Sequence, residues 1–199
     1  MSSVHLLKNT YCYFSIFQPY STNPTNQFLP LYGWMSKPYT TGMKTVMNIT
    51  RVVFWLGICQ LAGLASIPFV QPNMDWFHTL ARPPLAPPDA VFGPVWTVLY
   101  LLLGLSSAWL FCRGLSKELR PAAALLIIQL VLNACWTPVF FGMHNFQLAL
   151  AVVALMLAEG FFMHRSYAKH SKIAALLLWP YWVWLGFATY LTAGFMMLN

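Results

Sequence analysis

Five long apolar runs follow one another along the chain after residue 50, separated by shorter polar segments. A bilayer core about 30 Å thick is crossed by a helix of about 20 apolar residues, so each run is long enough to span a membrane. The links between the later runs are short, which favours an antiparallel bundle. The pattern predicts an all-α integral membrane bundle of five transmembrane helices with a long loop between the first two. The predicted spans are residues 50–70, 91–112, 121–142, 146–164 and 174–198.

The composition supports the membrane as the solvent of this chain. Of its 199 residues, 59% are hydrophobic and only 8% are charged, whereas a soluble domain carries about 25% charged residues. The net charge of +7 fits contact with anionic lipid. No stretch interleaves basic and aromatic side chains as a nucleic-acid groove does. We therefore expect the lipid bilayer as a partner and no nucleic acid.

The positions of the basic residues predict the orientation of the bundle. Near the ends of the five runs, the six successive flanking segments contain 3, 1, 3, 0, 3 and 0 lysines and arginines. Lysine and arginine are retained on the cytoplasmic side of membrane proteins. The alternation therefore predicts an N-terminus on the inside and a C-terminus on the outside.

Residues 1–46 differ from the rest of the chain. They are rich in Ser, Thr, Tyr, Pro and Asn and contain no acidic residue. They lack an apolar stretch followed by a small-residue cleavage site, so no secretory signal is expected. We interpret them as an extension that is poorly ordered or that results from a start codon assigned too far upstream. Residues 47–199 are then the membrane domain.

A proline-rich segment, ARPPLAPPDAVFGPVW (81–96), precedes the second apolar run. Proline pairs cannot continue a helix, so the segment should be a stiff extended link. Residues 73–83 just before it have the spacing of a short amphipathic helix. The long loop, residues 71–90, is therefore predicted to be a lid over the outer end of the bundle. The candidate lid residues are Trp76, Arg82, Pro83, Pro84, Pro87 and Pro88.

Three of the predicted helices carry aromatic and polar side chains on one face. Residues three or four positions apart share a helix face, and amide side chains within a membrane point inward toward partners. Such faces could enclose a pocket for a planar, mostly apolar ligand. Periodicity alone leaves open the alternative that they only pack the bundle or form interfacial belts. The candidate ligand-binding residues are Trp96, Tyr100, Asn133, Trp136, Tyr181, Trp184 and Ala188.

The ionisable and metal-binding residue types suggest no catalytic or metal site. Glu159 is the single acidic residue inside a predicted span, and we expect it to reach the membrane interface near His164. The alternative is a functional role, because acidic residues inside membranes are often functional. The cysteines have no metal-ligand spacing and are expected to be packing residues. They are Cys12, Cys59, Cys112 and Cys135.

Two further features leave alternatives open. His78 and His144 lie on outer loops and could reach the iron of a haem, although a single loop histidine is more often only solvated. Gly104 and Ala108 form one pair of small residues four positions apart, which is a weak signal for helix contact.

Three separated segments resemble the signature segments of the TspO/MBR family, which comprises tryptophan-rich sensory proteins and the mitochondrial translocator protein, or peripheral benzodiazepine receptor. They are RPPLAPPDAVFGPVWTVLY (82–100), QLVLNACWTPVFFGMHN (129–145) and PYWVWLGFATYL (180–191). The resemblance covers residues 50–199. It implies a five-helix bundle, often a homodimer, that binds porphyrins such as protoporphyrin IX. It also implies synthetic isoquinoline carboxamide or benzodiazepine ligands and, for some members, cholesterol.

The resemblance carries specific roles to individual residues. Trp96 and Trp184 match the two pocket tryptophans that are implicated in light- and oxygen-dependent porphyrin breakdown in some members. Further pocket positions of the family are matched by Tyr100, Asn133 and Ala188, and the lid positions by Trp76 and the four lid prolines.

The chain also departs from the family pattern. Leu85 and Ala90 replace two loop tryptophans, and Thr192 stands where asparagine is common. No basic residue follows Tyr190, so the sterol motif proposed for animal members is absent, which lowers the expectation of cholesterol binding. The missing animal-type C-terminal tail points to a bacterial-type member in the cytoplasmic membrane; a eukaryotic member would lie in the mitochondrial outer membrane.

The leading hypothesis is a membrane protein that is not an enzyme and binds tetrapyrroles for sensing, buffering or transport. It needs no cofactor, and protoporphyrin IX or haem would be its ligand. Arg82 is a candidate partner for the ligand's carboxylates. The alternatives are a light-dependent porphyrin-degrading enzyme and a transporter of sterols or other small molecules.

Overall fold

The computed structural model describes residues 39–111 and 114–199, with side chains from residue 49 onward. The chain divides into a unit of residues 1–50 and a unit of residues 51–199, and the second unit forms the helical bundle. Of the predicted extension, residues 1–46, only the helical residues from Tyr39 onward are described. Its other residues lie outside the described part of the chain, so the expected disorder stays a prediction there.

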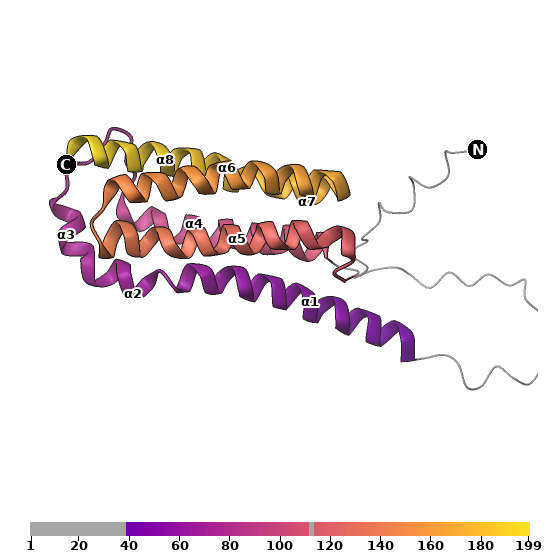
Figure 1. Cartoon of the computed structure of the whole chain (residues 1–199). Helices are drawn as coiled ribbons and strands as arrows, with labels where there is room; N and C mark the ends of the chain where they lie inside the picture. Colours follow the sequence, from indigo (N-terminus) through magenta and orange to yellow (C-terminus); the bar gives the residue numbers. More distant parts are fainter. Residues whose placement is uncertain (1–38, 112–113) are drawn as a thin grey trace, which may run out of the picture. The chain divides into compact units, whose positions relative to one another are not determined.

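Every regular element of the described residues is helical, and five helical segments are long and apolar enough to cross a membrane (Figure 1). These segments cover residues 49–79, 89–110, 117–142, 146–170 and 172–198. The predicted fold class is confirmed. The helices are α1 (Tyr39–Leu64), α2 (Ile67–Val70), α3 (Met74–Thr79), α4 (Phe92–Leu110), α5 (Arg120–Thr137), α6 (Phe146–His170), α7 (Lys172–Leu177) and α8 (Trp179–Leu198).

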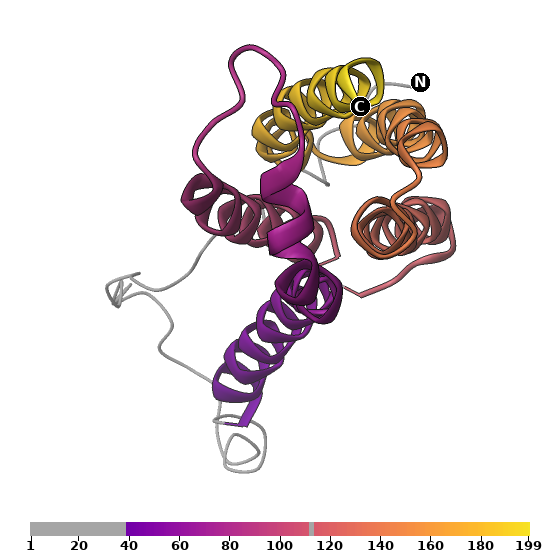
Figure 2. The same cartoon turned by 90° about the vertical axis from the view of Figure 1, so that its left-hand side faces the viewer.

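Helices α4, α5, α6 and α8 surround a common interior, as the view along the bundle shows (Figure 2). Helix α6 packs against both α5 and α8, and α4 packs against α7. The segment from α2 to the start of α4 crosses one end of this interior. The loop that the sequence assigned as a lid therefore lies over the end of the bundle.

Two prolines interrupt the predicted spans. Because proline lacks a backbone N–H, α5 gives way at Pro138 to a π-helical turn, Pro138–Gly142. Pro180 lies in the first turn of α8, where proline is tolerated, and α7 ends two residues before α8 begins. The polar side chains of Asn145 and Ser171 cap α6 and α7 by accepting backbone N–H bonds.

The proline segment is fastened to the C-terminal end of α8. The Tyr190 hydroxyl donates to the Pro84 carbonyl at 2.9 Å. The Asn199 side chain accepts from Ala81 N at 2.9 Å and donates to the Ala81 carbonyl at 3.1 Å. Pro83 is buried against the backbone of Gly194. These contacts hold the first half of the proline segment, residues 81–84, against α8.

Substitution of Gly194 by alanine should displace the lid from α8. A Cβ atom there would lie 2.5 Å from Cβ of Pro83, and overpacking of this kind costs about 1–3 kcal/mol. We expect faster hydrogen exchange at the Ala81 amide, which donates to Asn199 in the wild type. Gly186→Ala on the same helix is the control, because no atom lies within 4 Å of its new methyl group. Equal exchange in the two variants would contradict this docking.

Candidate functional site

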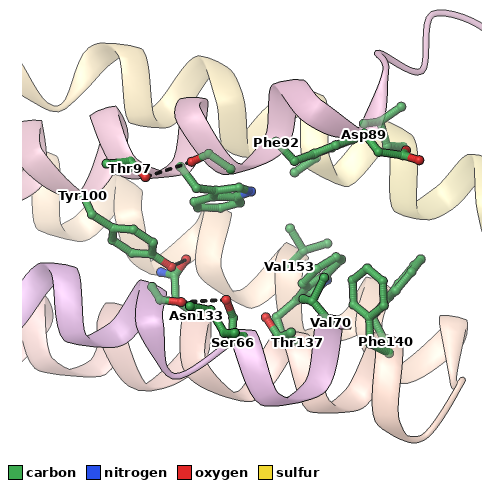
Figure 3. A pocket seen from close by; sticks show the side chains of 18 of the residues that line it. Ser66, Val70, Asp89, Phe92, Thr97, Tyr100, Asn133, Thr137, Phe140 and Val153 are labelled. Carbon is green, nitrogen blue, oxygen red and sulfur yellow. Dashed lines mark hydrogen bonds between the residues drawn. The ribbon is translucent and has the colours of Figure 1, made fainter. Parts of the chain in front are cut away.

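A cavity of about 440 Å³ lies inside the bundle, within the size range of about 300–1,000 Å³ that is typical of small-molecule sites. Helices α1 to α6, the π-helical turn and α8 all contribute to its wall. Figure 3 shows Tyr100 of α4 reaching toward Asn133 of α5, with Val70 and Phe140 further along the cavity. Six of the predicted ligand-binding residues line it: Trp96, Tyr100, Asn133, Trp136, Trp184 and Ala188.

Aromatic rings from α4 and α8 meet in this wall. The ring centroids of Trp96 and Trp184 are 6.5 Å apart with an interplanar angle of 87°, an edge-to-face arrangement that aromatic pairs favour. Tyr100 lies one turn after Trp96, at a centroid distance of 5.6 Å. On the α5 side, Trp136 stacks on Phe140 at 4.9 Å. The cavity therefore offers flat apolar surfaces from two directions.

Two indole nitrogens in this wall stand out because they are buried and donate to no acceptor within the described residues. They are Nε1 of Trp136 and Nε1 of Trp184. The hydroxyls of Thr97 and Thr192, which also line the cavity, are bonded to backbone carbonyls of their own helices. A buried donor without a partner costs about 1–3 kcal/mol. A ligand with hydrogen-bond acceptors would remove this cost.

The other predicted residues lie outside the lining of the cavity. Tyr181 is fully buried behind Asn133, whose amide nitrogen donates to its hydroxyl at 2.7 Å. Trp76 stacks on His144 at a centroid distance of 3.7 Å. Arg82 and the four lid prolines are also absent from the lining. The end of α2 and the loop instead face the cavity through residues that the sequence reasoning did not select: Val70, Gln71, Met74, Phe77 and Asp89.

Among the described residues that line the cavity, Asp89 is the one with a charged side chain. Its carboxylate already forms ion pairs. Arg82 contacts it at 2.5 Å and His78 at 2.9 Å. The Arg82 guanidinium also donates to the Pro87 carbonyl and lies over the Phe77 ring. A ligand carboxylate would therefore have to share Arg82 with Asp89.

The structure places the remaining candidates as follows. His144 contacts Asn73 at 3.3 Å, and the described residues contain no group of three side chains able to hold a metal. Haem ligation by His78 or His144 stays a prediction. Cys59 is buried and Cys135 exposed, both as free thiols, and the other two cysteines lie outside the described residues. Gly104 packs against α1 of the same chain.

The expectation for Glu159 was wrong. Its Oε1 is buried and has no hydrogen-bond partner among the residues that the structure describes, and its Oε2 lies against the side-chain amide of Gln129 on α5. The carboxyl group therefore turns toward α5 and not toward the interface near His164. The sequence feature that could have predicted this orientation is the amide pair Gln129 and Asn133, one helical turn apart. Polar side chains inside a membrane form hydrogen bonds with one another.

Comparison with known proteins agrees with this architecture. The sequence profile of the TspO/MBR family matches residues 52–198. The tryptophan-rich protein TspO of Chlorobaculum tepidum is 35% identical over 154 residues, which is 76% of this chain and 98% of that protein. The protein of the same name from Archaeoglobus fulgidus is 32% identical, over 77% of this chain and 99% of its own. The human translocator protein is 38% identical over 121 residues, 59% of this chain and 70% of its own.

Proposed function

Because this chain belongs to the TspO/MBR family, we propose that it binds a tetrapyrrole such as protoporphyrin IX in the cavity between α4, α5 and α8. It is an integral multi-pass membrane protein. The proposed role is to sense, buffer or transport the ligand, without a resident cofactor. We further propose the bacterial cytoplasmic membrane as its location, with the N-terminus inside and a homodimer as the assembly.

The observation that carries the proposal is the pair of buried indole N–H groups in an aromatic wall. Planar rings gain from stacking on Trp96, Tyr100 and Trp184. Acceptor atoms at the edge of the ligand would meet the free N–H groups of Trp136 and Trp184. A porphyrin carries both, through its ring and its carboxylates. The carbonyl groups of isoquinoline carboxamides and benzodiazepines would satisfy the same donors.

The lid gives the ligand carboxylates a second contact. Arg82 is held by Asp89 at the rim of the cavity, and exposed ion pairs contribute only about 0–1 kcal/mol. A ligand carboxylate can therefore exchange with Asp89 at little cost. This exchange would leave the apolar ring inside the bundle and its charged edge beneath the lid.

The test is a titration of the protein in lipid nanodiscs with protoporphyrin IX, followed by the ligand's visible absorbance. We expect Trp96→Phe/Trp184→Phe to weaken binding by about tenfold or more, because each aromatic contact contributes about 0.5–1.5 kcal/mol. Trp179→Phe is the control, because Trp179 is exposed and does not line the cavity. Equal affinity in all three proteins would refute the site.

The same samples distinguish the enzymatic alternative. Loss of the porphyrin spectrum under visible light in air, absent in the dark and absent in the double variant at saturating ligand, would indicate degradation by the protein. The light-dependent test uses the double variant because the rings of Trp96 and Trp184 lie close together in the cavity wall. A spectrum that stays constant supports binding without turnover.

A further inference from the structure

A chain of hydrogen-bonding side chains leads from the cavity wall to the carboxyl group of α6. The Tyr100 hydroxyl donates to Oδ1 of Asn133 at 3.3 Å. Nδ2 of Asn133 donates to the Tyr181 hydroxyl at 2.7 Å and to the backbone carbonyl of Gln129 at 2.8 Å. The second of these bonds fixes the Asn133 amide in one orientation. All four side chains are buried, so water does not compete for these bonds.

One assignment of the Gln129 amide satisfies both of its polar atoms. With its oxygen toward α8, it accepts the Tyr181 hydroxyl at 2.6 Å, and its nitrogen donates to the Met156 carbonyl at 3.1 Å and to Oε2 of Glu159. The reverse assignment would set the amide oxygen against the Met156 carbonyl, which carries no hydrogen, and against Oε2 of Glu159. The Gln129 amide therefore donates to the Glu159 carboxyl group.

This assignment gives the hydrogen-bond chain a single direction. Tyr100 donates to Asn133, Asn133 to Tyr181, Tyr181 to Gln129 and Gln129 to Glu159. Hydrogen bonds arranged in series polarise one another, and a bond to a charged acceptor is stronger than one to a neutral acceptor. Gain of one proton by the Glu159 carboxylate therefore weakens the bond from Gln129 and, through it, the bonds of Tyr181 and of Asn133 in the cavity wall.

The surroundings of Glu159 leave its charge without an ionic partner in the described part of the chain. The ion pairs there are those of Asp89 with Arg82 and His78. The phenols of Tyr181 on α8 and Tyr167 on α6 lie within reach of the Glu159 charge. The ring of His164 packs against Trp179 and Trp182.

The helices packed against α6 place no further charge beside this carboxyl group. The charged side chain of α5 is Arg120 at its first residue, and that of α7 is Lys172 at its first residue, both exposed. Cys135 of α5 is exposed as well. The proton on Glu159 is therefore sensed mainly by Gln129 and Tyr181.

We propose that Glu159 is a proton-binding site whose occupancy is coupled, through Gln129, Tyr181 and Asn133, to occupancy of the cavity. The step is the transfer of one proton from the aqueous phase to a carboxylate oxygen, which forms an O–H bond and removes the negative charge. Coupling between two sites is reciprocal, so a ligand that contacts Tyr100 and Asn133 must change proton binding by the factor by which protonation changes ligand binding. This second half rests on the proposed function.

The first experiment needs no ligand. Infrared spectra of the protein in nanodiscs are recorded across pH, and the carboxyl band of Glu159 is assigned by its loss in Glu159→Gln. We expect Tyr100→Phe, at the cavity end of the chain, to shift this band or its titration midpoint. Tyr190→Phe is the control, since that hydroxyl bonds to the lid. A Glu159 band that is the same in wild type and Tyr100→Phe, or a carboxyl group that does not titrate, overturns the proposal.

The second experiment measures protoporphyrin IX affinity against pH. The porphyrin carboxylates also bind protons, so the ligand affinity depends on pH even without Glu159. The pH profile of affinity in Glu159→Gln therefore serves as the baseline. We expect the wild-type affinity to change by about tenfold relative to that baseline across the titration of Glu159. Tyr181→Phe should follow the baseline. Trp179→Phe, which changes an exposed ring outside the lining of the cavity, should follow the wild type. Parallel profiles for wild type and Glu159→Gln overturn the coupling.

The two experiments separate two kinds of failure. If neither the wild type nor any variant binds protoporphyrin IX, the proposed function fails. The infrared comparison still decides whether a change at Tyr100 affects the carboxyl group of Glu159 through the hydrogen-bond chain. If binding is intact but independent of Glu159, the proposed function stands and the coupling is refuted.

Discussion

Replacing Gly104 by leucine is expected to separate α1 from α4 and to lower the free energy of unfolding by about 3 kcal/mol. A Cβ atom on Gly104 would lie 2.9 Å from the Cα atom of Leu56 and 3.2 Å from the carbonyl oxygen of Trp55. Both are backbone atoms, so no side-chain rotation can relieve the contact. In a membrane, such close approach of helix backbones replaces the hydrophobic effect as the source of association. The measurement is thermal unfolding of the protein in detergent.

The matched control lies on the other helix of the same pair. Gly57 is exposed on α1, and no atom lies within 4 Å of the Cβ position. Gly57→Leu should therefore unfold at the wild-type temperature or slightly above it, since leucine favours helix more than glycine does. If Gly104→Leu is as stable as Gly57→Leu, the small residue at position 104 does not hold α1 in place.

The number and order of the helices could be predicted because they depend on lengths of apolar sequence. A run of about 20 apolar residues has to be helical inside a bilayer, whatever its neighbours are. The structure keeps the five predicted spans. Most of their ends move by a few residues, as for the helix that begins at Arg120 and the one that continues to His170, but the first segment continues to residue 79 where the prediction ended at residue 70. The proline segment was also predictable, because proline restricts the backbone locally.

The inward face of each helix was harder to predict. Lipid and bundle interior are both apolar, so hydrophobic periodicity distinguishes them poorly. Only the polar residues then indicate which face of a helix is turned inward. Gln129 and Asn133 marked the interior face of α5, and both are buried. Glu159 has no polar neighbour on its own helix at such spacing, and its partner on α5 depends on a helix packing that the sequence does not state.

The same reason explains why two candidate residues, Tyr181 and Trp76, lie outside the lining of the cavity. Tyr181 and Trp184 are three residues apart and share a face of α8, but that face meets both the cavity and the packed interior behind it. Trp184 lines the cavity, whereas Tyr181 bonds to the back of its wall. In the loop, Trp76 was selected from the helical spacing of residues 73–83 and from the family resemblance. Its ring stacks on His144, and the neighbouring Phe77 lines the cavity instead.

These placements give the hydrogen-bond chain a structural meaning. A tyrosine that lines a cavity contributes to binding directly, whereas Tyr181 connects the two amides that relate Tyr100 to Glu159. Because Tyr181 is completely buried, water does not reach the hydrogen-bond chain at this residue. In the proposed coupling, Tyr181 would therefore transmit a change between the cavity and the carboxyl group and would not contact the ligand itself.

Substitution of Ala188 by tryptophan should weaken protoporphyrin IX binding strongly by filling the cavity. Ala188 lines the cavity one turn after Trp184, so a large ring there would occupy the space between the aromatic walls. The backbone around it is held by the Thr192 hydroxyl, which donates to the Ala188 carbonyl at 2.8 Å. No hydrogen bond of the cavity wall is removed by this change. We expect the dissociation constant for protoporphyrin IX to rise by about 100-fold or more, equivalent to about 2.7 kcal/mol.

Two variants make this prediction specific to the cavity. Ala154→Trp adds the same ring to an exposed position of α6 and should bind like the wild type. Ala188→Leu adds less volume and should give an intermediate dissociation constant, which a general loss of folding would not produce. Thermal unfolding of each variant in detergent reports whether the bundle is intact. Wild-type affinity in a stable Ala188→Trp protein would mean that the ligand binds outside this cavity, because a tetrapyrrole and the added indole cannot occupy the same space.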